Sequence, residues 1–158
     1  MKKQDLVWEV LPQYWYESAY MGNRMLGLMI YKEPNQNYIR FETGNCAVHD
    51  HRPGGGLFNN PMLLTGYFAL FPEGEIINGT MRLDIWNAET NIEIKTTKGM
   101  INVHALVHSN EMVILVRSTA SDDEKGFRWE DSQSTTSAPD VFITTLTRII
   151  TQQIYPMK

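Results

Sequence analysis

The sequence has few of the features that mark several large classes of protein. Its one cysteine, Cys46, rules out an internal disulfide. The net charge is −4 and no basic block occurs, which argues against a nucleic-acid partner. No long apolar run follows residues 1–5, so we predict neither a signal peptide nor a membrane span. The sequence also lacks a nucleophile elbow, a P-loop and a dinucleotide-binding fingerprint, and we expect no cofactor.

The apolar residues that are present follow the two-residue period of β-strands. Residues 81–85, 92–95 and 101–108 alternate apolar with polar side chains. Such segments follow one another with short polar separators, and no long helical period lies between them. We therefore predict that residues 1–158 form a single all-β domain, an antiparallel β-sandwich of the supersandwich-like kind, with room for one short C-terminal helix.

Three other segments give more specific predictions within this fold. Residues 38–42 alternate with Ile39 and Phe41 on the inward face. Asn78–Gly79 predicts a two-residue hairpin turn, because both residue types tolerate a positive φ. Residues 112–116 have no polar break, which predicts a central strand that is covered on both faces.

Four segments depart from the strand pattern. Residues 44–61 are polar and rich in glycine, and loops of this length in a compact domain are often functional. Residues 122–126 predict a charged, solvated turn, and the Ser/Thr-rich residues 131–139 are expected to be flexible. The C-terminal residues 140–158 fit either a short helix or a final strand.

Two groups of histidines are candidates for chemistry. Cys46, His49 and His51 supply a thiolate and two imidazoles at short spacing, a combination that can hold Zn²⁺. No fourth ligand is evident, so two ordinary histidines in a polar loop are the favoured interpretation, and we expect no metal. His104 and His108 share a strand face but lie about 13 Å apart, too far for one metal ion.

Carboxylates and aromatic side chains give two further candidates. Glu42 and Asp50 flank the polar loop, and sugar hydrolysis usually needs two carboxyl groups, although nothing in the sequence forces these two together. Large apolar side chains are more often buried than used for binding, so packing in a core or at a domain joint is the favoured interpretation of the N-terminal aromatic residues. Their alternative role is to offer flat faces to sugar rings, and the residues are Trp8, Tyr14, Trp15, Tyr16 and Tyr20.

Residues 20–31 contain the stretch Gly-Asn-Arg-Met-Leu-Gly-Leu-Met-Ile, soon after an N-terminal tryptophan. This stretch resembles the Gly-Asn-Gly-x-Leu-Gly-x-Met-Val motif of glycoside hydrolase family 95, with Arg24 in place of the second glycine. Residues 39–45 are similar to the family's Leu-Asn-Glu-Asp-Thr stretch, of which Glu42 and Thr43 are recognisable. The resemblance continues in the family's order over most of residues 8–120, at residues 65–70, 81–90 and 107–117.

The resemblance implies that the chain is the N-terminal β-sandwich of a larger bacterial glycoside hydrolase. The catalytic groups of that family lie in an (α/α)₆ barrel that follows the sandwich, and its members typically hydrolyse α-L-fucosides with inversion, with α-galactoside relatives. The chain alone would then be noncatalytic, with the C-terminal catalytic domain of the same parent and the glycan substrate as its partners. Two loops, at residues 22–24 and 42–52, would approach the sugar with the candidate binding residues Asn23, Arg24, Glu42, His49, Asp50 and His51.

Two other functions stay open at this point. One is a free-standing carbohydrate-binding module that uses the N-terminal aromatic residues. The other is a small metal-dependent β enzyme centred on Cys46, His49 and His51. If the family resemblance holds, the parent is periplasmic or extracellular, and an exposed interdomain face would favour self-association of the isolated chain.

Overall fold

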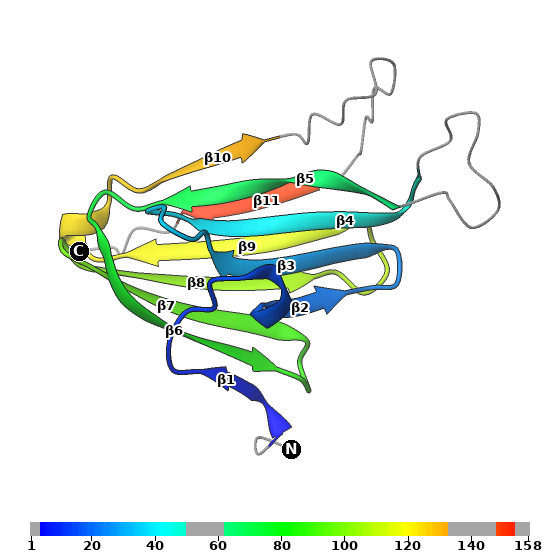
Figure 1. Ribbon diagram of the computed structural model, residues 1–158, viewed down its shortest axis with the longest axis horizontal. Helices are drawn as coiled ribbons and strands as arrows, with labels where there is room; N and C mark the ends of the chain where they lie inside the picture. The colour runs from blue at the N-terminus through cyan, green and yellow to red at the C-terminus, as the bar shows by residue number, and fades with distance from the viewer. Residues whose placement is uncertain (1–3, 50–61, 133–147, 154–158) are drawn as a thin grey trace.

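The computed structural model describes residues 4–49, 62–132 and 148–153, and in these ranges the chain forms β-strands and no α-helix (Figure 1). Two short 3₁₀ turns, η2 (Trp15–Glu17) and η3 (Asp122–Glu124), lie between strands. The strands are β1 (Leu6–Trp8), β2 (Ala19–Gly22), β3 (Leu26–Lys32), β4 (Ile39–His49), β5 (Met62–Phe71), β6 (Ile76–Asp84), β7 (Glu89–Thr96), β8 (Met100–Val107), β9 (Val113–Ala120), β10 (Arg128–Ser132) and β11 (Arg148–Gln153).

The strands pair into two sheets, which confirms the predicted all-β sandwich. One sheet has six strands in the order β1-β6-β7-β8-β9-β11, and the other has five in the order β10-β5-β4-β3-β2. Neighbouring strands are antiparallel with one exception, because β11 pairs parallel with β9. The C-terminal helix that the sequence allowed is therefore wrong over Arg148–Gln153, which form a strand.

The core lies between the two sheets and follows the predicted alternation. Ile39 and Phe41 point inward and are fully buried, as expected. The Phe41 ring lies 4.9 Å from that of Phe68 and 5.1 Å from that of Trp129, measured between centroids. Fully burying a large apolar side chain contributes roughly 1.5–3 kcal/mol, so this interface is the main source of stability. Its buried residues include Leu26, Leu28, Ile30, Leu70, Met81, Ile92, Ile94, Ile101, Val103 and Ile114.

Gly79 shows that the predicted hairpin at Asn78–Gly79 is wrong. Both residues lie inside β6, and the ladder to β7 continues through them. A Cβ added at Gly79 would lie 2.7 Å from Leu11 Cδ1 and 2.6 Å from the carbonyl oxygen of Glu93. Glycine is thus required at position 79 because Leu11 and the backbone of Glu93 lie too close for a side chain, and not because the chain turns there.

Leu11 belongs to a segment that closes one open edge of the sandwich. Residues 9–18 cross from β1, the edge of the six-stranded sheet, to β2, the edge of the five-stranded sheet (Figure 1). Leu11 is buried in the core, and the backbone N–H of Lys32 donates to the carbonyl oxygen of Pro12 at 2.8 Å.

The structure also corrects the expected limits of three segments. Residues 44–49 extend β4, so the predicted long loop starts later, and its remainder lies outside the described residues. Residues 131–132 belong to β10, while 133–139 also lie outside. The predicted strand at 112–116 is central, between β8 and β11, but Val113 and Leu115 on its outer face are only half-buried.

Glu124 overturns the prediction of a solvated turn at residues 122–126. Its side chain is fully buried, and its carboxylate links three parts of the fold. Oε1 accepts hydrogen bonds from the backbone N–H groups of Glu73, at 2.6 Å, and Gly74, at 3.0 Å. Oε2 accepts one from Thr96 Oγ1 at 2.7 Å. Hydrogen bonds to a charged acceptor are the stronger kind, so this carboxylate holds the β5–β6 turn against β7.

Replacing Glu124 with alanine should therefore lower the free energy of unfolding by about 3 kcal/mol, because the buried N–H of Gly74, the partly buried N–H of Glu73 and the Thr96 hydroxyl lose their acceptor. Urea titration followed by tryptophan fluorescence measures the change. The exposed neighbour Asp123 provides the matched control, and Asp123→Ala should cost less than about 0.5 kcal/mol. Equal effects of the two substitutions would contradict the structural role of Glu124.

Candidate functional site

The N-terminal aromatic residues are mostly exposed, so the core half of their predicted packing is wrong for most of them, and packing at a domain joint stays a prediction. Tyr14 is 47% exposed, Trp15 62%, and Tyr16 and Tyr20 65% each. Trp8 alone packs against the core, where it is half-buried. Several large aromatic side chains gathered on one surface of a small domain indicate a binding site or an interface.

Three of these rings are held in place by one another and by the η2 turn. The rings of Tyr14 and Tyr16 are stacked, with centroids 5.3 Å apart and planes at 4°. Trp15 meets Tyr16 edge-on at 5.6 Å. The carbonyl oxygens of Tyr14 and Trp15 accept hydrogen bonds from the N–H groups of Glu17, at 3.0 Å, and Ser18, at 3.3 Å. The rings are therefore exposed yet ordered.

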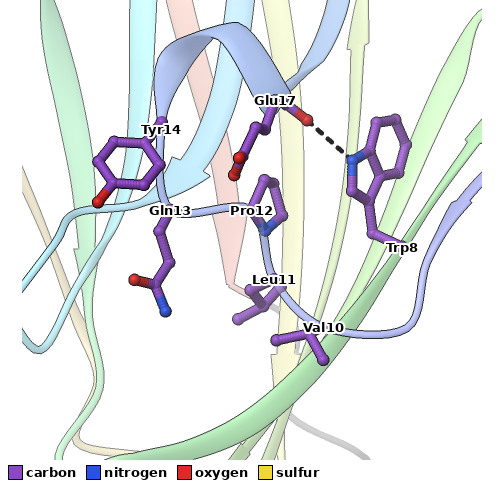
Figure 2. A pocket seen from close by; sticks show the side chains of 7 residues that line it. All are labelled: Trp8, Val10, Leu11, Pro12, Gln13, Tyr14 and Glu17. Carbon is purple, nitrogen blue, oxygen red and sulfur yellow. Dashed lines mark hydrogen bonds between the residues drawn. The ribbon is translucent and has the colours of Figure 1, made fainter.

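The same segment lines an open hollow of about 550 Å³, within the range of small-molecule sites. Figure 2 shows Trp8 and Tyr14 on opposite sides of it, with the Glu17 side chain reaching in between them. Trp8 Nε1 donates to the carbonyl oxygen of Glu17 at 2.8 Å, which fixes the indole ring. The residues that line the hollow are Trp8, Val10, Leu11, Pro12, Gln13, Tyr14 and Glu17.

The lining of the hollow combines apolar side-chain faces with two polar groups that make no hydrogen bond to the described part of the protein. Within the described ranges, neither the Gln13 amide nor the Glu17 carboxylate is hydrogen-bonded to another protein group. A ligand with an apolar face and several hydroxyl groups, such as a sugar ring, suits aromatic walls with a carboxylate and an amide nearby. Trp8 and Tyr14 stand out in the sequence as aromatic residues, whereas Gln13 and Glu17 do not, because only the reversal of the chain at residues 9–18 brings these side chains together.

Asn23 and Arg24, two of the predicted sugar-binding residues, lie in the turn between β2 and β3. The Asn23 side chain is committed to the fold, because Nδ2 donates to the carbonyl oxygens of His108, at 2.8 Å, and Glu111, at 2.9 Å. Its Oδ1 accepts from the backbone N–H of Leu26 at 2.8 Å. Arg24 is exposed and has φ of 73°, so the turn forms in the left-handed conformation that glycine would adopt more easily.

Glu42 lies on the outer face of the five-stranded sheet and inside β4, so the loop predicted to begin at Glu42 is wrong there. Its side chain is almost fully buried, and Tyr31 Oη donates to Oε2 at 2.5 Å. Arg40 lies next to it, with Nε 3.4 Å from Glu42 Oε2 and Nη1 3.1 Å from Glu33 Oε2. The Arg40 guanidinium also stacks on the Tyr67 ring at 3.9 Å. The Glu42 carboxylate is thus held by Tyr31 and Arg40 on the face of the sheet.

The remaining predicted ligands fall partly outside the described residues. His49 ends β4, whereas Asp50 and His51 lie beyond the described part of the chain, so the pairing of Glu42 with Asp50 stays a prediction. Cys46 Sγ lies 3.3 Å from Met25 Sδ. Among the described residues, no three metal-binding side chains gather at one point.

His104 and His108 have separate local partners. His104 Nε2 lies 2.9 Å from Glu89 Oε2 on the outer face of the six-stranded sheet. His108 Nδ1 accepts hydrogen bonds from the backbone N–H groups of Asn110, at 3.3 Å, and Glu111, at 3.1 Å, in the turn after β8. These contacts agree with the interpretation that the two histidines do not form one site.

Comparison with known proteins adds no family to these observations. No protein-family model and no curated protein sequence matches the chain. In the ranges that the structure describes, no helix has the length and apolar character needed to cross a membrane.

The Tyr31–Glu42 hydrogen bond gives a prediction for alkaline pH. Burial, together with the adjacent Glu42 carboxylate, raises the pKa of Tyr31 well above its ordinary value of 10.0. Because the pKa of Tyr31 is higher in the folded state than in the unfolded state, the neutral tyrosine contributes its full stabilisation to the fold below about pH 10. As the pH rises further, this contribution to the free energy of unfolding is lost, by at most about 1.4 kcal/mol per pH unit for one group. Denaturant titrations at pH 9 and pH 11 should therefore show a larger loss for the native chain than for Tyr31→Phe.

The control is Tyr16→Phe, which also removes a phenol hydroxyl but does so at an exposed position. Tyr16 is exposed and should leave the pH dependence of the native chain unchanged. Identical pH dependence of the native chain and Tyr31→Phe would contradict the predicted coupling.

Proposed function

We propose that this chain is a noncatalytic β-sandwich that binds glycans in the hollow at residues 8–17. The observation that carries the proposal is the exposed but ordered Tyr14, on the wall opposite Trp8, with the Glu17 carboxylate between them. Sugar rings have apolar faces that stack on aromatic rings, while their hydroxyl groups bond to carboxylates and amides. The hollow presents both kinds of partner within one ten-residue segment.

The carboxyl groups at the hollow favour binding of a sugar without its cleavage. Glycoside hydrolysis generally requires two carboxyl groups on opposite sides of the scissile bond. Among the described residues that line the hollow, one carries a carboxyl group, Glu17. Glu42 and Glu124 lie elsewhere and are hydrogen-bonded to the protein, Glu42 to Tyr31 and Glu124 to the β5–β6 turn and Thr96. The hollow is therefore equipped to hold a sugar and not to hydrolyse one.

The resemblance to glycoside hydrolase family 95 supports a wider setting for this activity. In that setting the chain is the N-terminal domain of a periplasmic or extracellular enzyme, and a C-terminal catalytic barrel cleaves α-linked fucose or galactose. The sandwich would support the barrel and retain the glycan near it. Self-association of the isolated chain through its interdomain face belongs to the same proposal.

The test is calorimetric titration of the chain with α-fucosylated and α-galactosylated oligosaccharides. Tyr14→Ala should weaken binding by at least about tenfold, because it removes an aromatic wall, and Glu17→Gln should also weaken it. Tyr20→Ala is the matched control: Tyr20 is also highly exposed but lies across Gly27, outside the hollow, and its loss should leave the affinity unchanged.

Two results would count against the proposal. One is the absence of binding to any of these glycans at millimolar concentration, and the other is binding that neither Tyr14→Ala nor Glu17→Gln alters. Release of free sugar by the purified chain would refute its noncatalytic part. Denaturation midpoints of the variants should match that of the native chain, so that a loss of affinity is not a loss of fold.

A further inference from the structure

Trp86 is the most exposed large apolar side chain among the described residues, with 71% of its surface accessible. It lies in the turn between β6 and β7, far in sequence from the hollow. Tryptophan is enriched at binding interfaces, because burying its large ring is favourable. The glycan hollow and the core described above do not account for this residue.

The turn that presents Trp86 is fixed by one carboxylate. Asp84 Oδ1 accepts hydrogen bonds from the backbone N–H groups of Trp86 and Asn87, both at 3.0 Å, and Oδ2 accepts one from Asn87 Nδ2 at 3.0 Å. The hydrogen bonds from Asn87 lower the pKa of Asp84 below its ordinary value. The backbone beneath the indole ring is therefore ordered before any ligand arrives.

Strand β1 connects the hollow with this turn. Trp8 is paired with Met81 and Leu6 with Leu83, so β1 runs from the hollow towards the end of β6. Figure 1 shows the β6–β7 turn near the start of β1. Met81 and Trp86 are five positions apart, which corresponds to at most roughly 17 Å of extended chain, a distance longer than one sugar ring.

Exposed apolar side chains lie along this path. Leu6, on the same face of β1 as Trp8, is 50% exposed, Ile85 is 52% exposed, and Val10 at the hollow is 63% exposed. A second protein strand is a less suitable occupant, because β1 has only three residues and the ion pair between Asp5 and Arg82 lies beside it. Short strands and charged side chains are the usual means by which edges avoid pairing with other strands.

We propose that the glycan site continues from the hollow along β1 to Trp86, so that the ligand is an extended oligosaccharide and not a single terminal sugar. This inference rests on the proposed glycan binding in the hollow. Trp86 then stacks on a sugar unit distant from the unit that Tyr14 contacts, and the apolar strip between them carries the intervening units.

The experiment compares Trp86→Ala with the native chain in titrations against short and long ligands. The short ligands are L-fucose, D-galactose and their disaccharides, and the long ones are fucosylated and galactosylated oligosaccharides of increasing length. Trp86→Ala should weaken binding of the long ligands by about tenfold and leave the short ones unchanged. Ile77→Ala is the control, because Ile77 is 62% exposed on the same strand, at its other end, and its loss should alter neither class.

The outcomes separate this inference from the proposed function. If Tyr14→Ala loses binding while Trp86→Ala binds long ligands normally, the extension is wrong and the hollow remains a glycan site. An equal loss for short and long ligands would also overturn the extension. If the native chain binds no glycan, both proposals fail. Sedimentation that shows a dimer of the native chain and a monomer of Trp86→Ala would instead assign Trp86 to self-association and overturn the inference.

Discussion

The open edge between the two sheets has to be closed, and the contact of Leu11 with Gly79 closes it. The buried Leu11 side chain occupies space that any side chain at position 79 would fill. Because this contact anchors the middle of the segment, the chain reverses around it. Trp8 and Tyr14 then lie on opposite sides of the hollow (Figure 2). The candidate site is therefore a consequence of how the core is sealed.

The buried carboxylates Glu124 and Glu42 stabilise the fold, so they are not candidates for binding a ligand. Glu124 accepts two backbone hydrogen bonds and one from a hydroxyl, and Glu42 is bonded to Tyr31 beside Arg40. An ionised group is costly to bury unless hydrogen bonds or opposite charges compensate it, and both residues meet this condition. Glu17 differs, since its carboxylate reaches into a hollow and, among the described residues, has no protein partner.

The sequence predicted most of the strands, because an inward-facing apolar residue at every second position is a local property. It failed where a residue is chosen by a distant contact. Asn78–Gly79 looks like a hairpin turn, yet Gly79 is there for Leu11, which lies 68 positions earlier. Likewise, Glu124 stands in a charged run, and only the fold brings Gly74 and Thr96 to it. The aromatic walls of the hollow were visible in the sequence, whereas Gln13 and Glu17 became candidates only once the chain reversal was known.

A site that is open and lies at the edge of the sandwich requires that its lining residues be ordered before a ligand binds. A ligand that is not enclosed gains affinity from several small contacts, and each contact is worth less if the protein must first become ordered. Here the ordering is already present: Trp8 is bonded to Glu17, Tyr14 is stacked on Tyr16, and Asp84 fixes the turn below Trp86. Accidental exposure of aromatic residues would not require such anchoring. The combination of high exposure and fixed geometry is what distinguishes these side chains from the scattered apolar residues found on any protein surface.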